Sequence, residues 1–208
     1  MSKNTNIPQA PQWTIEEYRT YIEGLHLPRY EEIPDIDLYM DQLITYIDTA
    51  LRPLLPRDEK LLTSSMVNNY VKQGIIPTPQ AKRYNRNHVA YLMMMCLLKR
   101  SFSMQDMQHF IDVQVKTHEL ASSYNFMCTA LERTLQLLFN CEEGNQEFNS
   151  LEIAEPTGCA FALSIANEKD LSHERRLALA AGTCAANKIF VEKVLEFYLP
   201  AHPEQHAE

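Results

Sequence analysis

The feature that most constrains the fold is an unbroken apolar run from Val89 to Leu98. A helix that is apolar on all sides is stable only when other elements surround it, so this run predicts a helix at the centre of a core. Asn85 precedes the run and is a good N-cap. The chain has only five glycines in 208 residues, which favours helices over a many-turned β sandwich or barrel. The sequence therefore predicts an all-α fold.

Apolar residues at three- and four-residue spacing predict further helices on both sides of this run. We expect them at about Thr14–Glu23, Asp35–Leu51, Thr63–Gly74, Ser103–Ile111, Ser122–Asn140 and Ser172–Leu199. Pro53 and Pro56 end the second of these helices, and Gly74 can take the left-handed conformation that ends the third. The small residues from Ala178 to Ala186 would let another helix approach closely.

The charge of the chain is unevenly distributed. The net charge is −8, yet residues 57–100 contain eight basic side chains and only two acidic ones. This window therefore carries +6, which leaves −14 on the rest of the chain. A basic island on an acidic protein is typical of a discrete module that binds nucleic acid, although a chance cluster on a solvated face gives the same pattern.

Composition also indicates the compartment. No apolar stretch reaches the roughly 18 residues that a membrane span needs, and residues 1–12 are polar and contain proline instead of a secretory signal. The five cysteines are odd in number and far apart, which suits reduced thiols better than a disulfide framework. The sequence predicts a cytoplasmic protein with no contact with a membrane.

The predicted helix at residues 63–73 has two distinct faces. At 100° per residue, its apolar side chains fall on one side and its small polar side chains on the other. The polar face consists of Ser64, Ser65, Asn68, Asn69 and Lys72. Asparagine can pair with adenine through two hydrogen bonds and serine can bond several base edges, so this face predicts a recognition helix in the major groove of DNA.

A basic loop follows this helix. Residues 77–86 contain Lys82, Arg83, Tyr84 and Arg86, which are placed to bind phosphates beside the predicted helix. Phosphate contacts position a protein on DNA without reading its sequence. Helix and loop together predict an interface with double-stranded DNA.

The order of these parts resembles the MerR-type winged helix-turn-helix regulators. The matching motifs are Thr63, Val67, Asn69-Tyr70, Gly74-Ile75-Ile76-Pro77, Lys82-Arg83-Tyr84-Asn85 and Phe102-Ser103-Met104-Gln105-Asp106-Met107, within residues 60–112. The resemblance implies a winged helix-turn-helix with a small β wing near residues 75–84. The arginine and first tyrosine of the family motif are Asn68 and Asn69 here, so the phosphate contacts of those two residues are not carried over.

A second resemblance covers residues 28–120. The segments Leu-Pro-Arg-Tyr-Glu-Glu-Ile-Pro-Asp and Met-Val-Asn-Asn-Tyr-Val-Lys-Gln-Gly are similar to an uncharacterised Gram-positive bacterial family, a domain of unknown function with the number eighteen thirty-six. This resemblance indicates a family for the chain but implies no activity.

We predict three regions: residues 1–35 as an arm packed on the body, residues 36–118 as a DNA-binding domain, and residues 119–208 as a helical region for homodimerisation, with room for a small-molecule effector. The predicted function is transcription regulation. The alternative is a helical adaptor that keeps the scaffold but binds protein.

We expect neither an enzyme nor a bound metal or cofactor. Cysteine and histidine never stand at metal-ligand spacing, and the sequence shows no phosphate loop, nucleophile elbow or paired carboxylates. His88, His109, His118 and His173 are expected on the surface or at its boundary.

Overall fold

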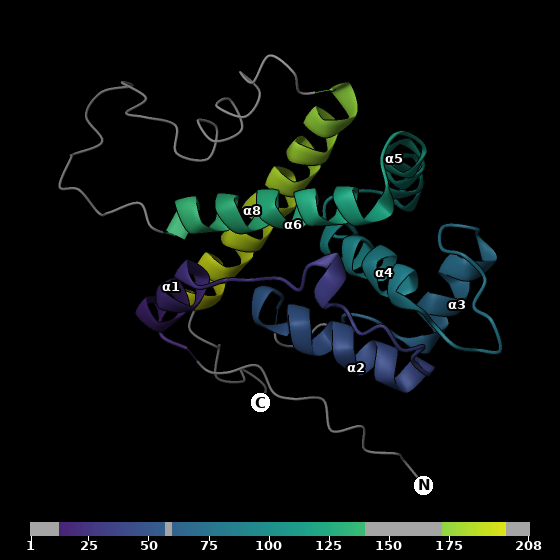
Figure 1. Ribbon diagram of the computed structural model, residues 1–208. Coiled ribbons are helices and arrows are strands. Elements are labelled where there is room, and N and C mark those ends of the chain that lie inside the picture. The colour runs from purple at the N-terminus through teal and green to yellow at the C-terminus, as the bar shows by residue number, and fades with distance from the viewer. Residues whose placement is uncertain (1–12, 57–59, 140–171, 199–208) are drawn as a thin grey trace, which may run out of the picture.

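The computed structural model describes residues 13–56, 60–139 and 172–198, and these are mainly helical (Figure 1). The helices are α1 (Ile15–Glu23), α2 (Met40–Leu51), α3 (Ser64–Lys72), α4 (Arg86–Leu98), α5 (Met104–Thr117), α6 (Leu120–Phe139) and α8 (His173–Tyr198), with 3-10 turns η1 (Tyr30–Glu32) and η2 (Arg52–Leu54). The all-α prediction is confirmed. No helix in the described ranges combines the length and apolar character needed to span a membrane.

The predicted β wing does not form strands within the described residues. Its segment contains only two isolated antiparallel bridges, Leu38 with Tyr84 and Gln80 with Arg83. The turn at Gln80–Arg83 is closed by a single bridge, and Tyr84 pairs with Leu38 instead of with a residue of the same loop. The winged helix-turn-helix therefore stays a prediction.

Helix α4 forms the centre of the core, as the apolar run predicts. Every side chain from His88 to Leu98 is buried. The helix packs against α2, α6 and α8, which accounts for its lack of a solvent-facing side. His88 was expected at the surface or its boundary, but only 4% of it is exposed.

Helix α2 begins at Met40, five residues later than the sequence indicates. Leu38 and Tyr84 exchange two backbone hydrogen bonds of 2.8 and 2.9 Å, which hold the segment before α2 in an extended conformation. The Gln42 side chain then accepts a hydrogen bond of 2.9 Å from the Tyr39 amide and caps the helix. A long-range backbone pairing has therefore replaced the first turn of the helix that the sequence predicts from Asp35.

Helices α6 and α8 form the second part of the core. They cross closely because small residues of α8, including Ala178, Ala185 and Ala186, are buried in the contact. A Cβ atom added to Gly182 would lie 3.2 Å from the Cβ of Ala130 on α6. The small-residue run thus serves a contact within the chain.

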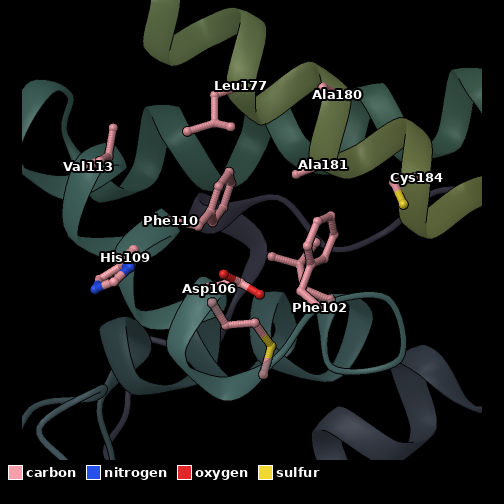
Figure 2. Close-up of a pocket in the computed structure, with 11 residues that line it drawn as sticks. Phe102, Asp106, His109, Phe110, Val113, Leu177, Ala180, Ala181 and Cys184 are labelled. Carbon is pink, nitrogen blue, oxygen red and sulfur yellow. The ribbon is translucent and has the colours of Figure 1, made fainter.

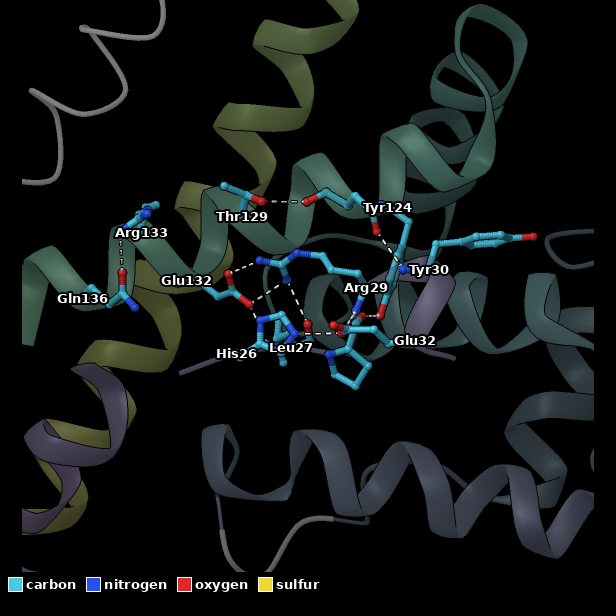
Figure 3. A network of polar contacts seen from close by, with 12 residues as sticks. His26, Leu27, Arg29, Tyr30, Glu32, Tyr124, Thr129, Glu132, Arg133 and Gln136 are labelled. Atoms are coloured by element: carbon cyan, nitrogen blue, oxygen red, sulfur yellow. Dashed lines mark hydrogen bonds and ion pairs between the residues drawn. The ribbon is translucent and has the colours of Figure 1, made fainter. Parts of the chain in front are cut away.

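The N-terminal segment is fixed to α6 by polar contacts (Figure 3). The Arg29 guanidinium donates to both carboxylate oxygens of Glu132, at 2.8 and 2.5 Å, and the Leu27 amide donates to the same carboxylate. Tyr124 donates to the Pro28 carbonyl at 2.8 Å. Residues 13–33 of the predicted arm therefore lie against the body, whereas residues 1–12 lie outside the described ranges.

Candidate nucleic-acid interface

Helix α3 has well-formed ends. Its N-cap Thr63 accepts a hydrogen bond of 3.2 Å from the Met66 amide. At the other end Gly74 has φ +72°, and two 3.0 Å bonds, from the Gly74 amide to the Val71 carbonyl and from the Ile75 amide to the Tyr70 carbonyl, form a Schellman motif. Both ends agree with the sequence prediction, and they fix which residues face outward.

The buried face of α3 is anchored in the core. Val67 is fully buried and Tyr70 is 3% exposed. Burial raises the pKa of the Tyr70 phenol, so this side chain is neutral and acts as part of the core. The outward face carries the five polar residues singled out from the sequence, all exposed: Ser64, Ser65, Asn68, Asn69 and Lys72.

The loop after α3 ends in a tight turn. Ala81 and Lys82 have φ of +48° and +59°, and the Arg83 amide donates to the Gln80 carbonyl at 2.8 Å. Two successive left-handed residues are the mark of a two-residue type I′ turn, although glycine or asparagine usually occupies it. This turn leaves the side chains of Lys82 and Arg83 exposed.

Arg83 is held in place by a tyrosine that sequence reasoning missed. Its guanidinium lies 4.7 Å from the centre of the Tyr39 ring and donates a 2.8 Å hydrogen bond to a Tyr39 hydroxyl. Tyr39 itself is 53% exposed. The two residues are 44 positions apart, so only the pairing of Leu38 with Tyr84 brings them together.

Two other predicted phosphate contacts lie elsewhere. Tyr84 is 3% exposed and packs edge-on against His88, so its side chain belongs to the core. Arg86 is half-buried, donates to the Ile33 carbonyl at 2.9 Å and lies 3.6 Å from the Asp35 carboxylate. The sequence predicted both residues as phosphate contacts of the basic loop, but Tyr84 packs into the core and Arg86 contacts Ile33 and Asp35.

Arg86 lies in a small polar cleft of about 230 Å³, together with two carboxylates. Asp35 and Asp37 line this cleft beside Asn85 and Asn87. The charge of Arg86 is therefore compensated locally. The positive charge of the candidate interface rests on Lys72, Lys82 and Arg83.

The described residues offer no metal centre. They contain no group of three or more His, Cys, Asp or Glu side chains that could hold an ion. Cys96 and Cys128 are buried thiols whose pKa burial raises to about 12, while Cys184 is exposed. Cys141 and Cys159 lie outside the described ranges.

Residues 28–127 match the model of a family described as a domain of unknown function, DUF1836. The match includes α3, the turn and α4, and it supports the second of the two resemblances seen in the sequence. No curated protein and no solved structure matches the chain.

Proposed function

We propose that the protein is a DNA-binding transcription regulator whose helix α3 enters the major groove. The observation that carries this proposal is the outward face of α3, where five exposed polar side chains include no acidic residue. Figure 1 shows α3 and the loop that follows it at one end of the molecule, away from α8. In this view neither α6 nor α8 covers α3, so a duplex could approach the helix from that end.

The chemistry of this face suits base edges. A merely solvated helix usually carries several full charges, whereas this face has two hydroxyls, two amides and one ammonium group. Asn68 and Asn69 can each donate to and accept from adenine, and serine can bond to several bases. Since Thr63 and Gly74 fix both ends of the helix, these groups are presented on a rigid support.

The turn supplies the phosphate contacts in this proposal. Lys82 and Arg83 are exposed on a two-residue turn whose backbone is fixed by the Gln80–Arg83 hydrogen bond. Contact with Tyr39 restrains the Arg83 guanidinium, which reduces the entropy lost when it binds a phosphate. We further propose a cytoplasmic homodimer, because operators read by a recognition helix usually have two half-sites related by a two-fold axis.

Selection from a randomised duplex library at low salt, followed by titration of the enriched site and a scrambled duplex, tests the proposal. Asn68→Ala and Asn69→Ala should each weaken binding to the enriched site by about 1–3 kcal/mol and change scrambled binding little. Lys82→Ala and Arg83→Ala should weaken binding to the enriched site and to the scrambled duplex equally. Each should also reduce the slope of log affinity against log salt by about one unit.

Two exposed residues on other helices provide matched controls. Lys116→Ala removes one positive charge from α5, and Asn187→Ala removes one amide from α8. Neither should alter DNA affinity. Absence of binding to any duplex at low salt contradicts the proposal, and equal effects of the control variants would show that the wrong surface has been assigned.

A second candidate function is a protein-binding adaptor, and one observation favours it. Ile36 and Tyr39 flank Leu38, which pairs with Tyr84, and they are large apolar side chains with 68% and 53% exposure. Such residues commonly anchor protein interfaces. Under this reading, Ile36→Ser would abolish binding to a protein captured by the wild type, whereas a DNA-binding function would survive that change.

A further inference from the structure

A cavity of about 460 Å³ lies between α5 and α8 (Figure 2). Its walls are mainly apolar, and the rings of Phe102 and Phe110 project into it. Ala180 and Ala181 on α8 are too small to fill the space opposite these rings. Cavities of this volume and lining are typical of binding sites for small organic molecules.

The described polar lining of the cavity includes a carboxylate and the His109 imidazole. Asp106 is the one carboxylate among the described lining residues, and no lysine or arginine lines the space with it. The Ser103 hydroxyl donates to one oxygen of this carboxylate at 2.6 Å, which fixes its orientation. In the view of Figure 2 the Asp106 carboxylate lies below the rings of Phe102 and Phe110.

We propose that this cavity binds a small lipophilic amine in its protonated form. The ammonium group would pair with Asp106, and the faces of Phe102 and Phe110 would add cation–π attraction. The hydrocarbon part would fill the space left by Ala180 and Ala181. An anionic ligand of the same shape would meet the Asp106 charge, and the described lining offers it no lysine or arginine and only the imidazole of His109.

The apolar rim favours a small molecule with a hydrophobic body. Val113 on α5 and Leu177 on α8 are 38% and 43% exposed at the cavity. A ligand that covered them would remove apolar surface from water, which is favourable at roughly 25 cal/mol per Å². The proposal concerns this site alone and does not depend on DNA binding.

Cys184 gives a direct readout, because it is exposed and lines the cavity. The full-length protein is alkylated with iodoacetamide in the presence of 4-phenylbutylamine, 4-phenylbutanol or 4-phenylbutyrate, and modification of the Cys184 peptide is followed by mass spectrometry. The three probes share one hydrocarbon body and differ in head-group charge. The amine should protect Cys184 at a concentration about tenfold lower than the alcohol, and the carboxylate should protect least.

Variants separate the charge effect from a loss of folding. Asp106→Asn should remove the advantage of the amine while leaving protection by the alcohol unchanged, since a misfolded site would lose both. Asp112→Asn removes a carboxylate from the same helix outside the cavity and should change nothing. Ala180→Phe should fill the cavity and abolish protection by all three probes.

Three results would overturn the proposal. Equal protection by the three head groups, unaffected by Asp106→Asn, would show that the cavity does not select cations. Without any probe, Cys184 could be unreactive in concentrated protein and become reactive on dilution, while light scattering shows dissociation. That result would show that a second copy covers the cavity. No protection by any probe up to millimolar concentration would also refute it.

Discussion

Helices α3 and α8 each bury one face against the core, but their exposed faces differ in chemistry. The outward residues of α3 are hydroxyls, amides and one lysine. Along α8 the exposed residues include Leu177, Val191 and Leu195, which are between 43% and 50% exposed. Water can form hydrogen bonds with the exposed groups of α3. The exposed side chains of α8 are apolar, so covering them with another molecule would be favourable.

In the two proposals made above, this difference corresponds to two kinds of recognition in one chain. A face of hydrogen-bonding groups selects partners by the direction of donors and acceptors, as DNA bases require. An apolar face selects by shape and by the removal of water, as a lipophilic ligand or a helix of a second copy requires. The structure keeps the two faces on separate elements, and α4 lies within the core that supports both.

The largest predicted effect compares two residues on opposite faces of α8. Ile189 is 1% exposed, so Ile189→Ala should lower the free energy of unfolding by about 3 kcal/mol through lost burial and a cavity. Val191 is 50% exposed, so Val191→Ser should change it by less than about 0.5 kcal/mol. Urea denaturation of both variants at micromolar concentration measures the difference.

The same pair tests whether the apolar face is free. If Val191→Ser destabilises the protein as much as Ile189→Ala, and the loss grows with protein concentration, the face is buried in a dimer. The contrast between α3 and α8 would then describe one protomer and not the assembled protein.

Much of the fold followed from local patterns. The apolar run at Val89–Leu98 predicted the central helix, and Thr63, Gly74 and Asn85 marked helix ends that are found in the structure. These predictions succeeded because capping and periodicity depend on residues close in sequence. The start of α2 was wrong, since Leu38 pairs with Tyr84, 46 residues further along the chain.

The site could be predicted only in part for the same reason. Helical periodicity identified the exposed face of α3 correctly, because the period depends on a single helix. It could not show that Tyr39 supports Arg83, or that Tyr84 turns inward, since both depend on tertiary pairing. The cavity between α5 and α8 requires residues about 70 positions apart, Phe110 and Ala181 among them, and no local pattern indicates it.

An intermediate effect is predicted at the end of α3. Gly74 has φ +72°, while a Cβ atom added there would meet nothing within 4 Å. Gly74→Ala should therefore cost about 1 kcal/mol from backbone strain alone. Gly74→Asn should cost less, since asparagine tolerates this conformation better. Thermal denaturation compares them, and equal stability of all three proteins would contradict the assigned helix end.

The smallest predicted effect is a pH dependence of stability, in which His88 on α4 and Glu192 on α8 respond in different pH ranges. Desolvation lowers the pKa of His88 on α4, and the opposing influences of the Pro77 backbone and Asp37 do not outweigh it. Above pH 6.5 this histidine is neutral in both the folded and unfolded states, so it causes no loss of stability there. As the pH falls below 6.5 the unfolded chain binds a proton before the folded protein does, and the free energy of unfolding decreases.

The support of α8 should respond in a different range. Burial raises the pKa of Glu192, but hydrogen bonds from Arg100 and Lys188 outweigh it, so the net pKa is lowered. Its contribution is present above the unfolded value of 4.5 and is lost as the pH falls through the lower folded value. Urea denaturation of the wild type should therefore give a lower free energy of unfolding at pH 5.5 than at pH 7.5. This decrease should be smaller in His88→Gln, whereas Glu192→Gln should show the same decrease as the wild type. Parallel behaviour of wild type and His88→Gln would show that protonation of His88 does not limit the stability of the α4 region.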